Sequence, residues 1–141
     1  MLNMDTKKRL LSKIAEIDSY LEELKSIELS SLDEYRDSIE KKRACERLLQ
    51  ILIEVIVDIC YLLFQEKKMG VPKDDDSVIS ELNKKKVINK DVKDLITKLK
   101  GFRNILVHKY GTIDDELVYE NLKENLGDFE KVRDAFLKVM Q

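Results

Sequence analysis

One stretch of the sequence decides the fold: Leu48 to Phe64, which reads LLQILIEVIVDICYLLF. Its polar residues are Gln50, Glu54 and Asp58, which continue a four-residue spacing that begins at Glu46. Residues four apart lie on one face of an α-helix, so these side chains form a single stripe along an otherwise apolar helix. Because charges so near its centre would make a membrane span costly, the stretch predicts the core helix of a water-soluble bundle and no membrane partner.

The polar stripe has two possible environments. It could face solvent on an ordinary bundle helix, or its acids could be partly buried and pair with basic side chains from another helix or subunit. A helix that is apolar nearly all round must be covered on most sides. A bundle of this size is expected to be too small to provide that cover alone, so we expect a symmetric homodimer.

Apolar residues at helical spacing on both sides of this stretch predict an all-α bundle of four to five helices, one of them very long. One proline and four glycines in 141 residues fit this fold class better than a strand-rich fold, and the length fits one domain over residues 1–141. The expected helix N-caps are Ser30 or Ser31 before the long helix and Ser77 before the short third one. The expected helices run from about Asp5 to Ile27, Leu32 to Lys68, Ser77 to Lys84, Asn89 or Asp91 to a break at Gly111 and Thr112, and Asp114 to Met140.

Charge is distributed unevenly, although the formal net charge is only −2. Lys84 to Lys109 holds nine basic residues and two aspartates, whereas Thr112 to Glu130 holds seven acids and one lysine. The two segments could be solvated helix faces that partly neutralise each other, or the basic one could bind nucleic acid. The two cysteines, Cys45 and Cys60, lie about 22 Å apart on one predicted helix, too far for a disulfide, so we expect buried free thiols in a reducing cytoplasm.

The sequence contains one histidine, His108, in the string Gly101-Phe102-Arg103-Asn104-Ile105-Leu106-Val107-His108-Lys109-Tyr110-Gly111. An arginine can hold a phosphate with a charged fork of donors, and a histidine can transfer a proton near neutral pH. On an ideal helix Arg103 and His108 would point about 140° apart, so they could not meet at one phosphate. Either the helix loosens before the second glycine, or two copies of the string meet across a dimer axis.

A structural role for the string is the alternative. Arg103 would then pair with a stripe acid such as Glu54, His108 would occupy a helix C-terminus, and Tyr110 would pack its ring. The sequence shows no zinc-ligand cluster, phosphate-binding glycine loop or serine triad that would favour another class of enzyme.

The spacing R-x-x-x-x-H-x-Y resembles the signature of HEPN-domain ribonucleases, in particular the HepT toxins. The resemblance extends over nearly the whole chain, through Arg43 to Gln50, the acids Glu54 and Asp58, and Gly70-Val71-Pro72. Phe102 is a mild departure, since an aliphatic residue is more usual before the arginine.

This resemblance implies a dimeric, all-helical HEPN-type bundle that cuts RNA without a metal or other cofactor, in a cleft between protomers. His108 would act as general acid or base, Arg103 would stabilise charge on the scissile phosphate, and Asn104 would position one or the other. Glu46, Glu54 and Asp58 would be supporting acids, and we expect Glu54 or Asp58 to hold Arg103. The lysines expected to contact the RNA backbone are Lys98, Lys100 and Lys109.

The resemblance also implies a partner, an MntA-like minimal nucleotidyltransferase antitoxin that adds AMP to Tyr110. A bulky anion there would block the cleft and repel RNA. Two other functions remain open: a non-catalytic HEPN binding subunit of a nucleotidyltransferase, and a structural dimeric bundle without ligand chemistry.

Overall fold

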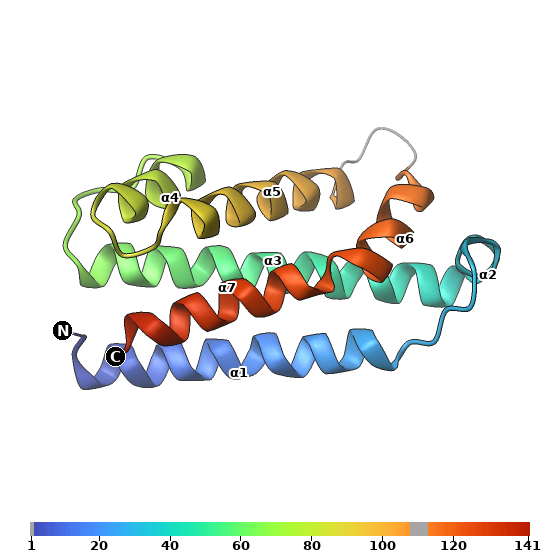
Figure 1. Ribbon diagram of the computed structural model, residues 1–141, viewed down its shortest axis with the longest axis horizontal. Coiled ribbons are helices and arrows are strands. Elements are labelled where there is room, and N and C mark those ends of the chain that lie inside the picture. Colours follow the sequence, from blue (N-terminus) through green and yellow to red (C-terminus); the bar gives the residue numbers. More distant parts are fainter. Residues whose placement is uncertain (1, 108–112) are drawn as a thin grey trace.

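The computed structural model describes residues 2–107 and 113–141, and in those ranges its secondary structure is entirely helical. Four long helices run alongside one another and three short ones lie at the ends of the bundle (Figure 1). The expected all-α fold with one very long helix is therefore confirmed. The helices are α1 (Met4–Ser26), α2 (Leu32–Asp37), α3 (Ile39–Glu66), α4 (Asp75–Lys84), α5 (Lys90–Leu106), α6 (Asp115–Glu124) and α7 (Leu126–Val139).

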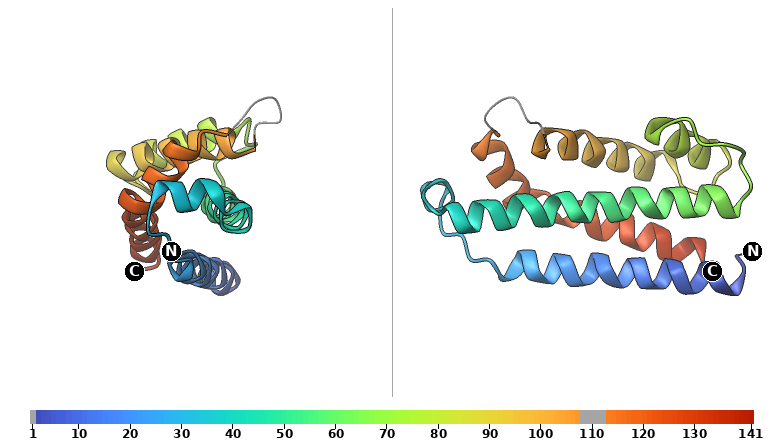
Figure 2. Two further views of the ribbon diagram at one scale, coloured as in Figure 1. Left: turned by 90° about the vertical axis from the view of Figure 1, so that its right-hand side faces the viewer. Right: turned by 180° about the vertical axis from the view of Figure 1, so that it is seen from behind.

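The long helices form a closed ring around one core. α3 packs against α1 and α5, and α7 packs against the same two helices from the other side (Figure 2). α4 lies against α3 and α5 at one end of the bundle, while α2 and α6 meet at the opposite end. α5 begins beside α4 and ends near α6, so its two ends have different neighbours.

Helix α3 is the centre of this core. Among residues 48–64 only Asp58 is exposed, because α1, α4 and α5 together cover the apolar faces. The expectation that a bundle of this size could not cover this helix is therefore wrong. By length and composition α3 could cross a membrane, but 61% of its most apolar window is buried inside the bundle, as in the core helix of a soluble protein.

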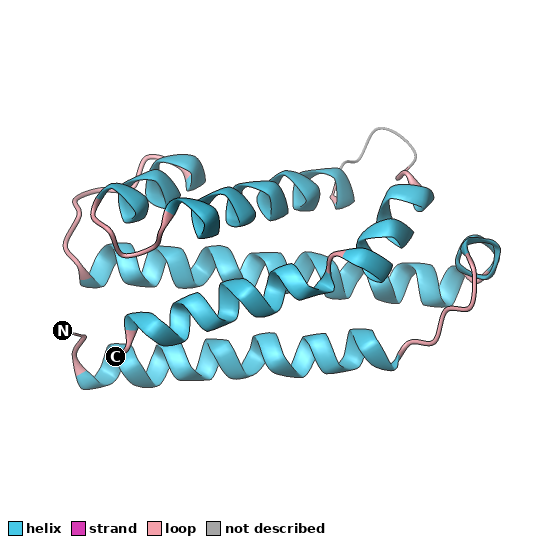
Figure 3. Cartoon of the chain, in the orientation of Figure 1, coloured by secondary structure: helices cyan, strands magenta, loops and turns pink. Residues whose placement is uncertain are grey.

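Two of the expected helices are each divided in two. Ser38 separates α2 from α3: its backbone is extended (φ −99°, ψ 99°) and its hydroxyl accepts a hydrogen bond from the backbone N–H of Lys41. Asn125 separates α6 from α7, ending one helix and preceding the other. The long apolar pattern continues across both breaks, which is why periodicity alone did not predict them (Figure 3).

The helix N-caps show where a local sequence signal was enough to predict the start of a helix. Ser31 caps α2 and Asn89 caps α5, as predicted, each with its side chain accepting a backbone N–H. Ser77 is not a cap: Asp74 caps α4 and accepts the backbone N–H of Ser77 at 2.7 Å. The polar loop expected to reach Asp76 therefore ends at Asp74.

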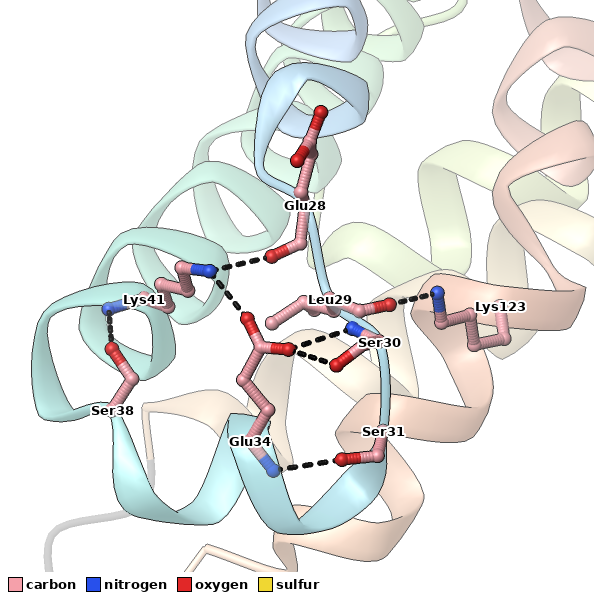
Figure 4. A network of polar contacts seen from close by, with 8 residues as sticks. All are labelled: Glu28, Leu29, Ser30, Ser31, Glu34, Ser38, Lys41 and Lys123. Carbon is pink, nitrogen blue, oxygen red and sulfur yellow. Dashed lines mark hydrogen bonds and ion pairs between the residues drawn. The ribbon is translucent and has the colours of Figure 1, made fainter.

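A polar network ties the α1–α2 connection to the rest of the bundle (Figure 4). The carboxylate of Glu34 accepts from Lys41 on α3 and from the backbone and hydroxyl of Ser30. The hydrogen bond from Lys41, followed by those from Ser30, lowers the pKa of Glu34 to about 2. The Lys123 ammonium on α6 donates to the carbonyl of Leu29 at 2.6 Å, so α2, α3 and α6 are joined at this end.

Both cysteines are buried free thiols, as expected. Burial is the main reason why the pKa of Cys45 rises to about 11 and that of Cys60 to about 12. Neither thiol is therefore activated for chemistry at neutral pH.

Candidate active site

Helix α5 positions the first half of the arginine–histidine string. Its buried residues recur every three or four positions and hold the helix against the core: Val92, Ile96, Leu99, Phe102 and Leu106. Phe102, the departure from the usual pattern, is part of this apolar face and is 7% exposed. The packing places the neighbouring Arg103 side chain at the surface, where 20% of it is exposed, and leaves Asn104 exposed.

Helix α5 ends earlier than expected. Its last helical residue is Leu106, and the backbone N–H of Val107 closes the final turn on the carbonyl of Arg103 at 3.1 Å. The expected 140° separation between Arg103 and His108 on an ideal helix therefore stays a prediction. The predicted site residues His108, Lys109 and Tyr110 lie outside the described residues.

Asp75, the first residue of α4, holds the Arg103 guanidinium. Arg103 Nη2 donates to Asp75 Oδ2 at 3.1 Å, and the hydroxyl of Tyr61 on α3 donates to Asp75 Oδ1 at 2.8 Å. Partial burial by itself would raise the pKa of Asp75, but these hydrogen bonds and the positive charge of Arg103 outweigh it and keep the pKa below its usual range. Burial and the bond to Asp75 also raise the pKa of Tyr61 to about 12. The carboxylate thus stays ionised and the tyrosine neutral, which fixes the arginine in one orientation.

The three consecutive acids before and within α4 have three different roles. Asp74 caps the helix, Asp75 pairs with Arg103, and Asp76 accepts from Lys100 Nζ at 2.6 Å. Lys100 and Arg103 are three residues apart and share one face of α5. The α4 N-terminus is therefore joined to the basic face of α5 by two adjacent ion pairs.

Sequence reasoning missed Asp75 and Tyr61 as site residues. Asp75 was assigned to a loop, and Tyr61 to the apolar core. A signal was present, since a run of three acids precedes a helix and Lys100 and Arg103 present two cations at i and i+3. Nothing in the sequence alone says that these two segments, 28 residues apart, come together.

The stripe acids do not hold Arg103 within the chain. Glu46 is buried and accepts from Arg43 at 2.8 Å, Glu54 accepts from Gln50 at 3.1 Å, and Asp58 lies 3.8 Å from the ammonium of Lys13 on α1. The stripe thus runs from a buried end to an exposed one. Neither expected environment describes it whole, because the buried Glu46 pairs within its own helix and the Asp58 that pairs with α1 is exposed. A pairing of Glu54 or Asp58 with Arg103 across a dimer stays a prediction.

The predicted RNA-binding lysines on α5 are engaged in ion pairs. Lys98 Nζ lies 3.3 Å from Asp128 Oδ2 on α7, and Lys100 is held by Asp76. Among the described residues, no three histidine, cysteine, aspartate or glutamate side chains come together as metal ligands, so no residue is assigned to a metal. The described part of the site is therefore an ionised Asp75–Arg103 pair at the end of a helix, beside an exposed asparagine.

Comparison with known proteins identifies the family. The sequence model described as "Ribonuclease HepT-like" matches residues 17–136. The tRNA nuclease HepT of Aphanizomenon flos-aquae is 34% identical over 103 residues, which are 73% of this chain and 70% of that protein. The mRNA nuclease HepT of Shewanella oneidensis is 28% identical over 87 residues, 62% of this chain and 65% of that protein.

Solved structures agree on the fold. The tri-AMPylated Shewanella oneidensis HEPN toxin, solved in complex with its MNT antitoxin, superposes with a TM-score of 0.81 at 22% identity, over 92% of this chain and 96% of that one. A cytosolic protein of unknown function from Bacillus subtilis, YutE, superposes with a TM-score of 0.78 at 19% identity, over 99% of this chain and 93% of that one. The family match over residues 17–136 confirms the resemblance seen in the sequence, and the chain belongs to the HepT-like ribonuclease family.

Proposed function

We propose that the protein is a metal-independent endoribonuclease, the toxin of a toxin–antitoxin pair, and that a nucleotidyltransferase neutralises it by transferring AMP to Tyr110. The observation that carries this proposal is the Arg103–Asp75 pair: the motif arginine is fixed by an ionised carboxylate at the end of α5, five residues before the only histidine. The relatives named tRNA nuclease and mRNA nuclease support RNA as the substrate class.

The chemistry divides between three residues. His108 takes a proton from the ribose 2′-hydroxyl as it attacks the phosphate, or gives one to the leaving oxygen as the chain breaks. Arg103 stabilises the negative charge that develops on the phosphate. A guanidinium has five N–H donors, so the ion pair through Nη2 leaves others for the substrate. Asn104, exposed beside Arg103, positions the phosphate or the imidazole.

RNA reaches the site along a partly neutralised surface. Lys98, Lys100 and Lys109 supply positive charge near Arg103. Lys98 and Lys100 reach RNA by exchanging the carboxylates of Asp128 and Asp76 for phosphates. An RNA substrate also implies a cytoplasmic protein, because the toxin must meet its target RNA there.

The active form is proposed to be a homodimer. Ile105 and Val107, beside Arg103 on and just after α5, are 40% and 41% exposed. Their burial against a second copy would bring two arginine–histidine strings together. This arrangement supplies the shared cleft that the family resemblance implies.

The test is the purified protein against RNA. His108→Ala should lower the rate of RNA cleavage about 10²–10⁴-fold, because general acid–base catalysis contributes that much. Arg103→Lys should also be severely impaired, since a point charge does not replace a fork of donors. Unchanged melting temperatures would show intact folds. Cleavage that survives His108→Ala would overturn the mechanism, and RNA binding without cleavage by the wild type would favour a non-catalytic binding subunit.

Neutralisation is tested separately by co-expression with the nucleotidyltransferase of the same system. Intact-mass measurement should show one or more additions of the mass of AMP. Tyr110→Phe should remove them and leave the toxin active. Efficient neutralisation of the Tyr110→Phe protein would show that the partner acts by simple occlusion instead.

A further inference from the structure

Among the described residues, a cluster of positive charge without ion-pair partners lies at the end of the bundle away from Arg103. Two adjoining open cavities of about 580 and 570 Å³ occupy the end of the bundle where α3 and α4 terminate and α5 begins. In Figure 1 this is the end opposite α2 and α6. Together the cavities form what we call the lysine groove, whose six lysines are Lys67, Lys68, Lys85, Lys86, Lys131 and Lys138.

These lysines differ from those beside Arg103 in having no carboxylate partners. All six are exposed, and none takes part in an ion pair with any residue in the described ranges. The two acids that line the groove are already engaged, Asp134 with Arg133 at 3.2 Å and Glu81 with Lys84 at 3.5 Å. By contrast Lys98 and Lys100 are paired with acids. The groove is therefore a part of the described surface where bound anions would displace no internal ion-pair partner.

Helix termini explain only part of this cluster. Lysines after α3 and α4 and near the end of α7 would each favourably meet the negative end of a helix dipole. The helix-dipole explanation needs only one lysine at each helix C-terminus. It does not explain Lys131, which lies in the middle of α7. Lys68 and Lys86 adopt left-handed backbone conformations (φ 54° and 60°), for which glycine or asparagine would be better suited. The turns alone therefore do not explain why lysines occupy these positions.

We propose that the lysine groove binds the phosphate backbone of the RNA substrate at a distance from the cleavage site. This inference rests on the proposed ribonuclease function. Flexible ammonium groups on several elements suit sequence-independent contacts with successive phosphates. Fourteen residue steps along α5 separate its N-cap Asn89, which lines the groove, from Arg103, so at 1.5 Å per residue the groove lies about 21 Å from the active arginine. At about 3.4 Å per stacked nucleotide this corresponds to roughly six nucleotides, so the groove contacts only RNA longer than that.

The test compares two RNAs and two triple variants. The probes are a stem-loop of about 30 nucleotides and a single strand of about four, and only the first can reach both sites. The groove variant combines Lys85→Gln, Lys131→Gln and Lys138→Gln, which avoids the two left-handed positions. The control removes the same charge from α1 outside the groove, with Lys7→Gln, Lys8→Gln and Arg9→Gln.

For the long RNA, the groove variant should show about a tenfold rise in KM with unchanged kcat, because uniform binding is lost. The slope of log affinity against log salt concentration, measured in the His108→Ala background, should become shallower by about 2. Cleavage of the short RNA should not change, and the control triple should behave like the wild type. Equal affinity of the groove and control variants for the long RNA would overturn the proposal.

A loss of binding to the antitoxin, with RNA affinity intact, would likewise overturn it and assign the groove to a protein partner. Failure of the wild type to cleave either RNA would instead remove the proposed function. The binding measurements would still decide whether the groove holds RNA.

Discussion

At the scale of single residues, Arg103 is held by a chain of contacts from three helices. Tyr61 on α3 orients Asp75 on α4, and Asp75 holds Arg103 on α5. An unpaired arginine on the surface would lose side-chain freedom each time it bound a phosphate. The ion pair fixes one edge of the guanidinium before substrate arrives. Asp75 is therefore expected to act as a positioning residue for the phosphate contact.

Asp75→Asn should lower kcat by about 10- to 100-fold with a smaller change in KM, since a misplaced group costs most in the transition state. Tyr61→Phe removes the hydroxyl that orients Asp75 but keeps the Asp75–Arg103 pair, so its loss of kcat should be smaller, within about threefold. Asp75→Glu should recover part of the loss. A wild-type kcat in a folded Asp75→Asn protein would contradict the positioning role.

The pH dependence of this pair has a definite sign. Because the folded-state pKa of Asp75 is lowered, its ion pair contributes stability above the ordinary aspartate pKa and loses it as pH falls through the lower folded value. The pair therefore remains ionised across the neutral range in which histidine titrates. A change of activity near neutral pH would therefore not come from the Asp75–Arg103 pair.

The sequence could predict Arg103, Asn104 and His108 as candidates because their residue types carry the chemistry and their spacing is local. It could not predict Asp75 as the partner, because that pairing depends on where α4 lies against α5. The sequence pointed to Glu54 or Asp58 as the partner of Arg103 only because these acids interrupt an apolar helix. Glu54 contacts Gln50 four residues earlier on the same helix, and the contact of Asp58 with Lys13 follows from the packing of α1 against α3.

At the scale of elements, Ser38 turns one long apolar pattern into two helices. Its hydroxyl accepts from the N–H of Lys41 at 3.3 Å, while its own N–H ends α2 on the carbonyl of Glu34 at 3.1 Å. The break lets α2 turn towards α6, with which it packs. Tyr35 on α2 is thereby buried, and its ring lies 6.1 Å from that of Tyr119 on α6.

Ser38→Ala should destabilise the protein by about 1 kcal/mol, the typical loss for removing an N-cap hydroxyl. For a chain of this size the melting temperature should fall by about 3–5 °C. Ser38→Asp should restore most of the stability, because a carboxylate also accepts the backbone N–H. Identical thermal melts for the wild type and Ser38→Ala would show that the break does not depend on the cap.

Helix existence was predictable from the sequence, whereas helix division was not. Apolar periodicity predicted α1 within one residue at each end. Local residue types narrowed the first cap to Ser30 or Ser31 and the start of α5 to Asn89 or Asp91, and the structure has Ser31 and Asn89. The same periodicity passes through Ser38 and Asn125 without interruption, and neither position has a proline. Those breaks are set by the packing of α2 on α6 and of α6 on α7, which no local pattern expresses.

At the scale of the whole molecule, the closed ring of α1, α3, α5 and α7 covers its own core. The proposed dimer therefore does not rest on the apolarity of α3, as the sequence suggested. It rests on Ile105 and Val107, which are exposed beside Arg103 at the end of α5 opposite the lysine groove. A second copy placed on this end would leave both grooves accessible to RNA.

Whether each active site is shared between two copies can be tested by mixing two inactive proteins. Arg103→Ala and His108→Ala variants, co-expressed with different affinity tags, should form mixed dimers that tandem purification isolates. If one protomer supplies the arginine and the other the histidine, a mixed dimer contains one site with both groups intact. The purified mixed dimer should then show about half of the wild-type RNA cleavage per dimer, although each parent is inactive.

Parents purified and assayed separately provide the control. No activity in the mixed dimer would place both groups of each site on a single chain, and a monomer by light scattering at micromolar concentration would exclude the shared site altogether.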